Sequence, residues 1–306
     1  MTARAIDLFA GAGGFTTGAL AAGVNVVWAA NHWPAAVDVH AYNHPGVAHA
    51  CQDLQQADWF SVPDHDLLLA SPACQGHSQA GQPGRSRKGV RERQQADRNT
   101  AWAVVNCAEV KRPARILVEN VADFLRWPLY PAWRQALELL GYVVNEYTFD
   151  AATFGVPQNR VRAVVSAGFM RPVELTDPGI TPVGFGACVD WDAGNWSPWA
   201  EKPAGVRRRI ARGRANGLGD RFLTHYVSGH PGRSLARPIG CITTKDQWSV
   251  VDGDRSRMLT RAELLRAMDF PSDYQLPRTK RDAVRMLGNA IPVGFARELV
   301  SQAVAA

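Results

Sequence analysis

The chain has 306 residues, of which 46% are hydrophobic and 20% are charged, and its formal net charge is +6 at pH 7. This composition is that of a globular protein with a sizeable core, it excludes a disordered or fibrous chain, and its basic balance is compatible with a polyanionic partner. We expect a reduced, cytosolic protein without a disulfide framework, a structural zinc site or a membrane span, because its five cysteines include no CxxC pair and no apolar run approaches ~18 residues.

Strand-like and helix-like segments alternate through the first half of the chain. Strands are predicted at residues 4–9, 24–30, 66–70 and 115–118, and helices at 13–22, 34–43 and 100–111. This alternation predicts an α/β fold, with a parallel sheet covered by helices on both faces. Ligands bind such sheets outside the carboxyl ends of the strands, which directs attention to the residues just after each predicted strand.

Residues 168–236 have a different character, because prolines, glycines, tryptophans and arginines are scattered there without a clear period. This segment predicts a small, irregular second domain or a long insertion. Helical patterns return at residues 260–268 and 282–305.

The first strand leads into DLFAGAGGF, which places Gly11, Gly13 and Gly14 at a strand-to-helix turn. Glycines there let the backbone approach a ligand and leave the helix N-terminus facing it, although many such clusters are only tight turns. A hydride-transfer cofactor would favour GxGxxG and an acidic residue after the second strand, and neither feature is clearly present. His32 and Trp33 stand there instead, and Trp33 either stacks on an adenine ring or is a half-buried packing residue.

Cys74, in SPACQGHS, directly follows a predicted strand, where a cysteine is placed for chemistry rather than for packing. A reactive thiolate needs a positive or polar neighbourhood. The basic run from Arg85 to Arg98 follows at once, and it is either a loop that closes over a phosphate backbone or a solvated surface loop.

Two further motifs carry polar side chains at strand ends. ILVENV places Glu119 where a carboxylate could hold or protonate a ring nitrogen, while Asn120 would also suit a helix N-cap. In FGVPQNRVR, Gln158, Arg160 and Arg162 alternate along a predicted strand start, so the two arginines share one face. The alternative is an exposed basic strand edge.

The ordered motifs FAGAGG, Cys-Gln, ENV, QNRVR and LGNAIP resemble those of the DNA cytosine-5 methyltransferase family across nearly the whole chain. RPIGCITTKDQ and LTRAELLRAMDFP agree with that family as well. The resemblance implies a Rossmann-like S-adenosylmethionine-dependent methyltransferase fold with a late antiparallel strand and a small irregular target-recognition domain. It implies a catalytic domain at residues 1–167, a target-recognition region at 168–236, and a segment at 237–306 that returns to the catalytic domain.

The resemblance also implies a reaction, in which a methyl group passes from S-adenosyl-L-methionine to carbon 5 of a cytosine flipped out of double-stranded DNA. Cys74 would attack carbon 6, Glu119 would contact ring nitrogen 3, and Arg160 and Arg162 would support the site. No metal is implied. The residues implied for the cofactor are Phe9, Ala10, Gly11, Gly13, Gly14, His32, Trp33, Asp53, Leu54 and Asn289.

The sequence departs from the family pattern at two positions. Ala73 stands where the family usually has proline before the catalytic cysteine, and His32 replaces the acidic residue that binds the cofactor ribose, which leaves open a modified cofactor. A tRNA-methylating enzyme of the same family, a catalytically silent nucleic-acid-binding relative and a cysteine enzyme acting on small nucleotides are the alternatives. We expect a monomeric, cytoplasmic enzyme of the restriction–modification type, bacterial or phage-encoded. Its predicted DNA contacts are Trp191, Trp196, Arg207, Arg208, Arg209 and Arg214.

Overall fold

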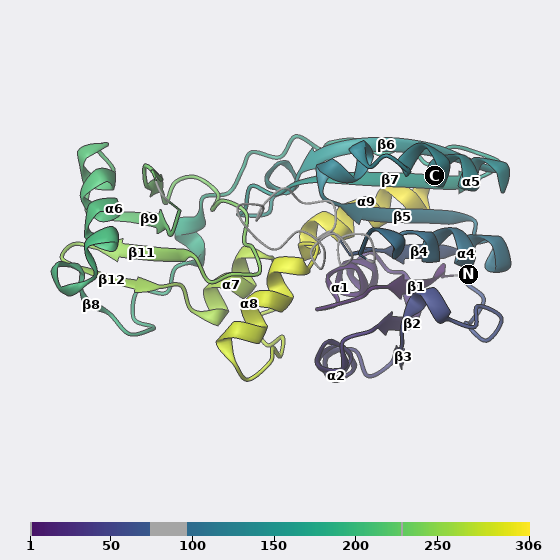
Figure 1. Cartoon of the computed structure of the whole chain (residues 1–306), viewed down its shortest axis with the longest axis horizontal. Helices are drawn as coiled ribbons and strands as arrows, with labels where there is room; N and C mark the ends of the chain where they lie inside the picture. Colours follow the sequence, from purple (N-terminus) through teal and green to yellow (C-terminus); the bar gives the residue numbers. More distant parts are fainter. Residues whose placement is uncertain (1, 74–96, 228) are drawn as a thin grey trace. The chain divides into compact units, whose positions relative to one another are not determined.

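The computed structural model describes residues 2–73, 97–227 and 229–306, and it divides the chain into two compact units (Figure 1). Unit 1 comprises Met1–Asp150, Val161–Pro178 and Val293–Ala306, and unit 2 comprises Ala151–Arg160 and Gly179–Pro292. Unit 2 thus consists of a short segment before the expected residue 168 and a long one that starts at Gly179 and continues past residue 236 to Pro292.

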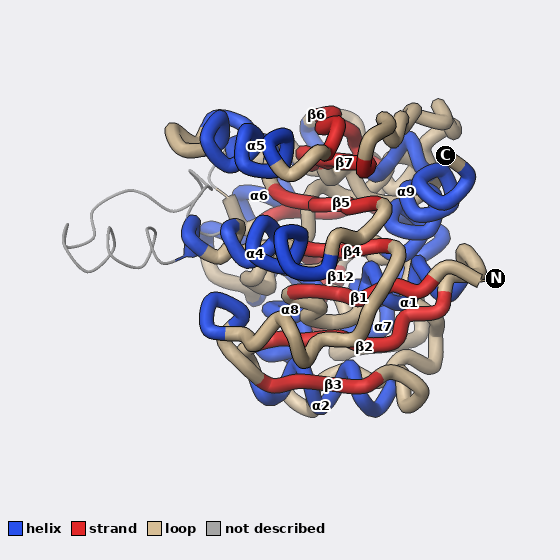
Figure 2. The backbone as a smooth tube through the Cα atoms, turned by 90° about the vertical axis from the view of Figure 1, so that its right-hand side faces the viewer, coloured by secondary structure: helices blue, strands red, loops and turns tan. Residues whose placement is uncertain are grey.

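Unit 1 is built on a sheet in which the described residues form seven strands, in the order β3-β2-β1-β4-β5-β7-β6 (Figure 2). The strands are β1 (Arg4–Leu8), β2 (Asn25–Asn31), β3 (Ala48–Cys51), β4 (Leu67–Ala70), β5 (Arg115–Asn120), β6 (Tyr142–Asp150) and β7 (Val161–Phe169). The pairs from β3 to β5 are parallel, whereas β7 lies antiparallel to both β5 and β6. The predicted α/β class and the late antiparallel strand are both confirmed.

Helices cover both faces of this sheet. They are α1 (Gly14–Ala21), α2 (Pro34–Asn43), α4 (Trp102–Lys111), α5 (Tyr130–Leu139) and α9 (Val293–Ala305). On one face, Ile6, Leu68 and Ile116 share a core with residues of α4 and α5. Helices α1 and α9 pack closely, since a Cβ on Gly18 would lie 2.6 Å from Cβ of Ala296. The strands are apolar because both of their faces are buried.

The single helix expected at residues 282–305 is a wrong prediction. The structure forms α8 (Lys280–Asn289) and α9 instead, separated by Ala290–Pro292. Pro292 lacks a backbone N–H and disfavours a helical conformation at Ile291, so the helix ends before it. The break is also where the chain passes from unit 2 to unit 1.

Unit 2 is built on an antiparallel sheet whose described residues form five strands, in the order β10-β9-β11-β12-β8. The strands are β8 (Ser197–Pro198), β9 (Arg221–His225), β10 (Arg233–Ser234), β11 (Trp248–Asp252) and β12 (Arg255–Met258), and the helices are α6 (Ala204–Ala215), α7 (Arg261–Ala267) and α8. In the region expected to be irregular, residues 170–184 and 189–196 form no helix or strand, whereas β9 pairs with β11 and β8 with β12, both of which follow residue 236. In the described ranges, no helix has the length and apolar character needed to cross a membrane.

Candidate active site

Backbone hydrogen bonds and left-handed residues fix the turn after β1, so that its backbone groups lie at the carboxyl ends of the strands. Phe9, Gly11 and Gly13 have positive φ angles of 62°, 54° and 78°. The N–H of Gly13 donates to the carbonyl of Ala10 (2.7 Å), and the N–H of Ala10 donates to the carbonyl of Ala30 beside it in β2 (3.1 Å). Helix α1 then begins at Gly14 without a side-chain cap, which leaves its N-terminus suited to an anionic group.

The residues expected around an adenosine follow β2 and β3 at the same edge. His32 is exposed, and Trp33 is half-buried as the N-cap of α2, with its N–H bound to Oδ1 of Asn31 (2.9 Å). Oδ1 of Asp53 accepts from the N–H of Gln55 (3.0 Å) and caps a short 3-10 helix. Leu54 is 2% exposed and packs in the core, so only its backbone remains for the predicted cofactor contact.

The segment after β4 leads directly to Cys74, which itself lies outside the described residues, as does most of the basic run from Arg85 to Arg98. Nδ2 of Asn120 donates to the carbonyl of Pro72 (3.1 Å), and the N–H of Ala73 donates to Oγ1 of Thr100 (3.0 Å). The first contact gives Asn120 a partner across the sheet rather than a helix to cap. Thr100 was not identified from the sequence, where nothing near it marks a site.

Glu119 in β5 and Arg162 in β7 are brought together on neighbouring antiparallel strands. Nε of Arg162 lies 2.9 Å from Oε1 of Glu119, and the two side chains are 11% and 6% exposed. The contact is one of opposite charges without the alignment of a hydrogen bond, and Oε1 accepts no hydrogen bond from any described residue. A buried carboxylate with unused hydrogen-bonding capacity is suited to meet a polar ligand.

Arg160 is placed differently from Arg162, because it precedes β7 and belongs to unit 2. It is 2% exposed, and its guanidinium donates to the carbonyls of Ile242 (3.1 Å) and Gly288 (3.0 Å). Gln158 is fully buried and accepts from the N–H of Ile242 (2.8 Å). The alternative of an exposed basic strand edge is excluded. Within unit 2 these side chains hold the segment that leads to Asn289, which is exposed at the end of α8.

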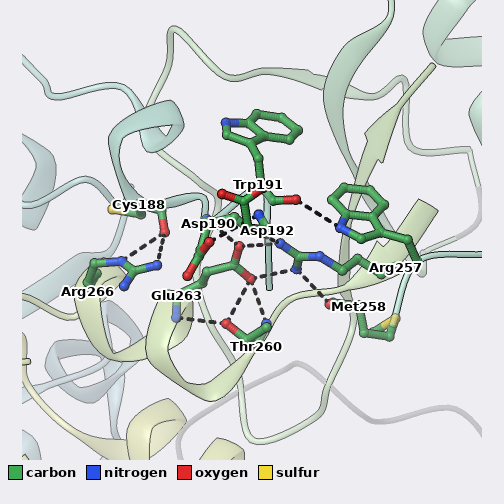
Figure 3. Close-up of polar contacts among 10 residues, drawn as sticks. Cys188, Asp190, Trp191, Asp192, Arg257, Met258, Thr260, Glu263 and Arg266 are labelled. Atoms are coloured by element: carbon green, nitrogen blue, oxygen red, sulfur yellow. Dashed lines mark hydrogen bonds and ion pairs between the residues drawn. The ribbon is translucent and has the colours of Figure 1, made fainter. Parts of the chain in front are cut away.

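Unit 2 contains a buried ion pair that organises the residues around α7 (Figure 3). Arg257 and Glu263 are 2% and 0% exposed at their side chains, and two of their bonds measure 2.7 and 2.8 Å. Glu263 also accepts from the N–H groups of Asp190 (2.9 Å) and Thr260 (2.7 Å), and Arg257 donates to the carbonyl of Asp190 (2.5 Å). Both backbone groups of Asp190 are thus held by one buried pair.

The loop that begins at Asp190 carries both tryptophans predicted to contact DNA. Trp191 and Trp196 are stacked with centroids 6.2 Å apart, and Nε1 of Trp196 donates to the carbonyl of Trp191 (3.2 Å). Guanidinium groups lie over both rings, with Arg221 4.3 Å from the Trp191 centroid and Arg255 4.8 Å from that of Trp196. Both rings are half-buried, whereas Arg207 and Arg208 on α6 are exposed.

A cavity of about 630 Å³ lies beside this loop within unit 2. It is lined by Gly194, Asn195, Lys202, Arg257, Met258, Leu259, Thr260, Arg261 and Lys280. No acidic side chain is among these lining residues, so the cavity favours an anionic or neutral polar ligand.

The amino-acid sequence matches a family model described as C-5 cytosine-specific DNA methylase over residues 3–173 and 200–305. Type II methyltransferase M.NlaX of Neisseria lactamica is 29% identical over 318 residues, covering 99% of this chain and 96% of the relative. Type II methyltransferase M.HgiDI of Herpetosiphon aurantiacus is 26% identical over 310 residues, covering 96% of this chain and 91% of the relative.

Solved structures share the fold over the whole chain. A mutant of DNMT2 from Spodoptera frugiperda matches with a TM-score of 0.72 at 19% identity, covering 99% of this chain and all of that one. A DNA modification methyltransferase described as putative, encoded within an Escherichia coli prophage, matches with a TM-score of 0.71 at 18% identity, covering 99% of each chain.

Proposed function

The chain belongs to the C-5 cytosine-specific DNA methylase family, and from this premise we propose how its residues divide the transfer of a methyl group to carbon 5 of cytosine in DNA. Cys74 is the nucleophile, Glu119 contacts the cytosine ring, and Arg162 holds Glu119. The tRNA alternative is not favoured, because the curated relatives are Type II methyltransferases.

The observation that carries these assignments is the state of Glu119. Its carboxylate is buried, lies 2.9 Å from one cation, and keeps an oxygen that no described residue hydrogen-bonds. Ring nitrogen 3 of cytosine can accept a proton from a carboxyl group, and the exocyclic amine can donate a hydrogen bond to the same group. Because Arg162 opposes Glu119 from the next strand, it limits the rotation of that carboxyl and keeps it directed toward its ligand.

The described residues fit S-adenosylmethionine as the methyl donor. The uncapped N-terminus of α1 suits the carboxylate of the methionine moiety, and the half-buried ring of Trp33 suits an adenine. Asp53 uses Oδ1 for the N–H of Gln55, so Oδ2 is left for the adenine amine. His32 is exposed beside Trp33, where a neutral imidazole can bind a ribose hydroxyl.

The chemical steps assigned to the chain follow from these positions. The Cys74 thiolate adds to carbon 6 of the flipped-out base, and Glu119 gives a proton to ring nitrogen 3. Carbon 5 then carries the electron pair that forms the new bond. S-adenosylmethionine supplies the methyl group from its sulfonium when it is bound. Loss of the carbon-5 proton to a base, return of the nitrogen-3 proton and departure of the thiolate restore the aromatic ring.

We propose that unit 2 reads double-stranded DNA and that one chain acts as a monomer. The exposed arginines of α6 and the cavity-lining Lys202 and Arg261 offer cations, while Lys280 of the same cavity is paired with Asp246 (2.6 Å). Contacts of this kind go chiefly to phosphates and position the protein, while bases are read by hydrogen bonds at their edges.

The experiment that tests this function uses a DNA duplex in which 5-fluorocytosine replaces the target cytosine. Fluorine cannot leave carbon 5 as a proton does, so the parent protein should form an adduct that survives denaturation when S-adenosylmethionine is present. Cys74→Ser should form none, and Glu119→Gln should form it far more slowly. An adduct formed equally well by Cys74→Ser would contradict the assignment of the nucleophile.

A further inference from the structure

A chain of hydrogen bonds runs behind the turn that follows β1 and ends on a buried carboxylate. Oδ2 of Asp7 accepts from both the N–H (3.1 Å) and Oγ1 (2.8 Å) of Thr16 in α1. Nε2 of His40 in α2 lies 3.0 Å from the same Oγ1, and Nδ1 of His40 lies 2.7 Å from Nε2 of His49 in β3. Asp7, Thr16 and His40 are at most 2% exposed, and His49 is half-buried.

The direction of each bond in this chain follows from its buried end. Because the Thr16 hydroxyl donates to Asp7, its oxygen accepts from His40, which therefore carries its proton on Nε2. Nδ1 of His40 then accepts, so Nε2 of His49 donates. Burial lowers the pKa of His40 to about 2, which agrees with a neutral ring that is both donor and acceptor. Every group in the chain has one defined role.

A second branch reaches the turn itself. Oγ1 of Thr17 donates to the carbonyl of Gly13 (2.7 Å) and lies 3.2 Å from Nε2 of His44. Gly13 is the left-handed residue that starts α1, and its carbonyl also accepts from the N–H of Thr17 (2.7 Å). Consecutive threonines of the first turn of α1 are thus each bound to one histidine, and the rings of His40 and His44 touch with centroids 4.7 Å apart.

Neither metal binding nor ordinary packing accounts for this arrangement. The 2.7 Å separation between the nitrogens of His40 and His49 is that of a hydrogen bond, and no group of side chains in the described ranges could hold a metal ion. A buried carboxylate is unfavourable in a core, and burial raises the pKa of Asp7 to about 7. A side chain of this kind is retained where its hydrogen bonds define one geometry.

We propose that Asp7, Thr16 and His40 are positioning residues for S-adenosylmethionine, because their hydrogen-bonded chain holds the start of α1 in the orientation that receives the cofactor. This inference rests on the proposed cofactor site. The turn from Phe9 to Gly13 lies directly between Asp7 and Thr16, so the two bonds from Thr16 to Asp7 close that turn across its base. A loosened chain would leave the turn to be ordered at the moment of binding, which weakens affinity.

The test compares two pairs of variants that differ only in hydrogen bonding. Thr16→Val keeps the side-chain shape but leaves Asp7 with one donor and His40 without an acceptor, whereas Thr16→Ser keeps both bonds. His40→Ala removes the link to His49, whereas His40→Gln offers an amide that can both donate and accept. His65→Ala is the matched control, because His65 is a buried histidine of the same unit at the opposite edge of the sheet, bound to the carbonyl of Pro63 (2.8 Å).

Binding of S-adenosylmethionine by calorimetry and single-turnover methylation are then measured for each variant. Thr16→Val and His40→Ala should raise the Kd roughly tenfold, the scale of one unpaired buried hydrogen-bonding group. The rate at saturating cofactor and the DNA affinity should stay within about twofold of the parent. Thr16→Ser and His40→Gln should restore most of the affinity. An equal loss of affinity in His65→Ala, or no rescue by the conservative variants, would mean that the hydrogen bonds of Asp7, Thr16 and His40 support only the general stability of the fold. Either result would overturn the proposal.

Failure of the proposed cofactor site would look different, because Trp33→Ala would then bind S-adenosylmethionine as tightly as the parent. A spectroscopic readout is independent of both outcomes. In protein labelled with ¹⁵N-histidine, the ring of His40 should carry its proton on Nε2 with Nδ1 unprotonated. The opposite tautomer at His40 would contradict the assigned direction of the chain.

Discussion

The N–H of Ala73 donates to Oγ1 of Thr100 across 3.0 Å, one residue before Cys74. The Thr100 hydroxyl in turn donates to the carbonyl of Asp97 (2.6 Å), so it both accepts and donates. A proline at position 73 could not make the first of these bonds, because it has no backbone N–H. Ala73, which departs from the family pattern, therefore makes a backbone hydrogen bond that the usual proline could not make.

We expect Thr100→Val to slow single-turnover methylation by roughly tenfold, because it leaves the Ala73 N–H unpaired beside the nucleophile. Thr100→Ser should retain most of the parent rate. The double variant with Ala73→Pro provides the control, since no donor remains for residue 100 to accept. If Thr100→Val has the same effect in that background as in the parent, the bond to Ala73 does not matter for the rate.

We expect substitution of Glu119 to lower mainly the methylation rate, and substitution of Arg162 to lower mainly the stability of unit 1. Glu119→Gln is expected to lower the methylation rate by about 10²–10⁴, the range of a lost general acid. Arg162→Met leaves a buried carboxylate without its cation and should destabilise unit 1 by about 3 kcal/mol in urea unfolding. The double variant should regain most of that stability, because both side chains are then neutral. Additive losses of stability would mean that the 2.9 Å contact is not a coupled pair.

The first half of the fold was predictable because its strands are continuous apolar runs bounded by glycine and proline. Other elements carried no such signal. Strand β3 consists of AHAC, and α6 buries only Val206, Ile210 and Gly213 among arginines, so neither shows a clear hydrophobic period. Antiparallel pairing in unit 2 joins β9 to β11 across residues that the sequence alone does not connect. A local hydrophobic pattern indicates which residues are buried, but it does not indicate which distant segments pair in one sheet.

The sequence indicated which residues lie at the candidate site, but it did not indicate which of their side chains contact one another. Residues at strand ends were identified because a parallel sheet brings them to one edge. The ion pair of Glu119 with Arg162, by contrast, depends on the antiparallel register of β5 and β7. Arg160, two residues from Arg162, binds carbonyls within unit 2. Spacing in the sequence could not reveal that the chain passes between units at that point.

The stability of unit 1 should fall as the pH falls from about 6.5 to 5. Burial lowers the pKa of His40 from 6.5 to about 2 and that of His44 to about 4, so the unfolded chain binds these two protons first. Asp7 has the opposite sign, because its pKa is raised from 3.8 to about 7 and the folded state binds that proton first. Burial also lowers the pKa of His49 and of His65 in the same unit, so these two groups act in the same direction as His40 and His44. At least about one net proton therefore remains toward pH 5, which gives a loss of about 1.4 kcal/mol per pH unit or more.

The test is urea unfolding of the parent and of Asp7→Asn at several pH values in this window. The amide of this variant keeps an acceptor for Thr16 and cannot take up a proton, so the opposing contribution disappears. The slope of the unfolding free energy should therefore become steeper by about 1.4 kcal/mol per pH unit. An unchanged slope would mean that the pKa of Asp7 in the folded protein is not raised above this window.

Exchange of the recognition region should change the methylated sequence only when the exchanged segment respects the sheet of unit 2. An exchange of residues 168–236, the bounds expected from composition, separates β9 and β10 from β11 and β12, which complete the same sheet. An exchange of residues 179–258 from a relative with arginine at position 257 keeps the five strands together and retains the partner of Glu263. We expect the second chimera to fold and to methylate the donor's sites, with S-adenosylmethionine affinity within about twofold of the parent.

The first should be the less stable of the two by about 1–3 kcal/mol or more, because it replaces one side of a packed core that includes Phe222 and Val251. Sequencing of methylated DNA and urea unfolding give the two readouts, and a well-folded second chimera that still marks the parent's sites would locate specificity outside residues 179–258.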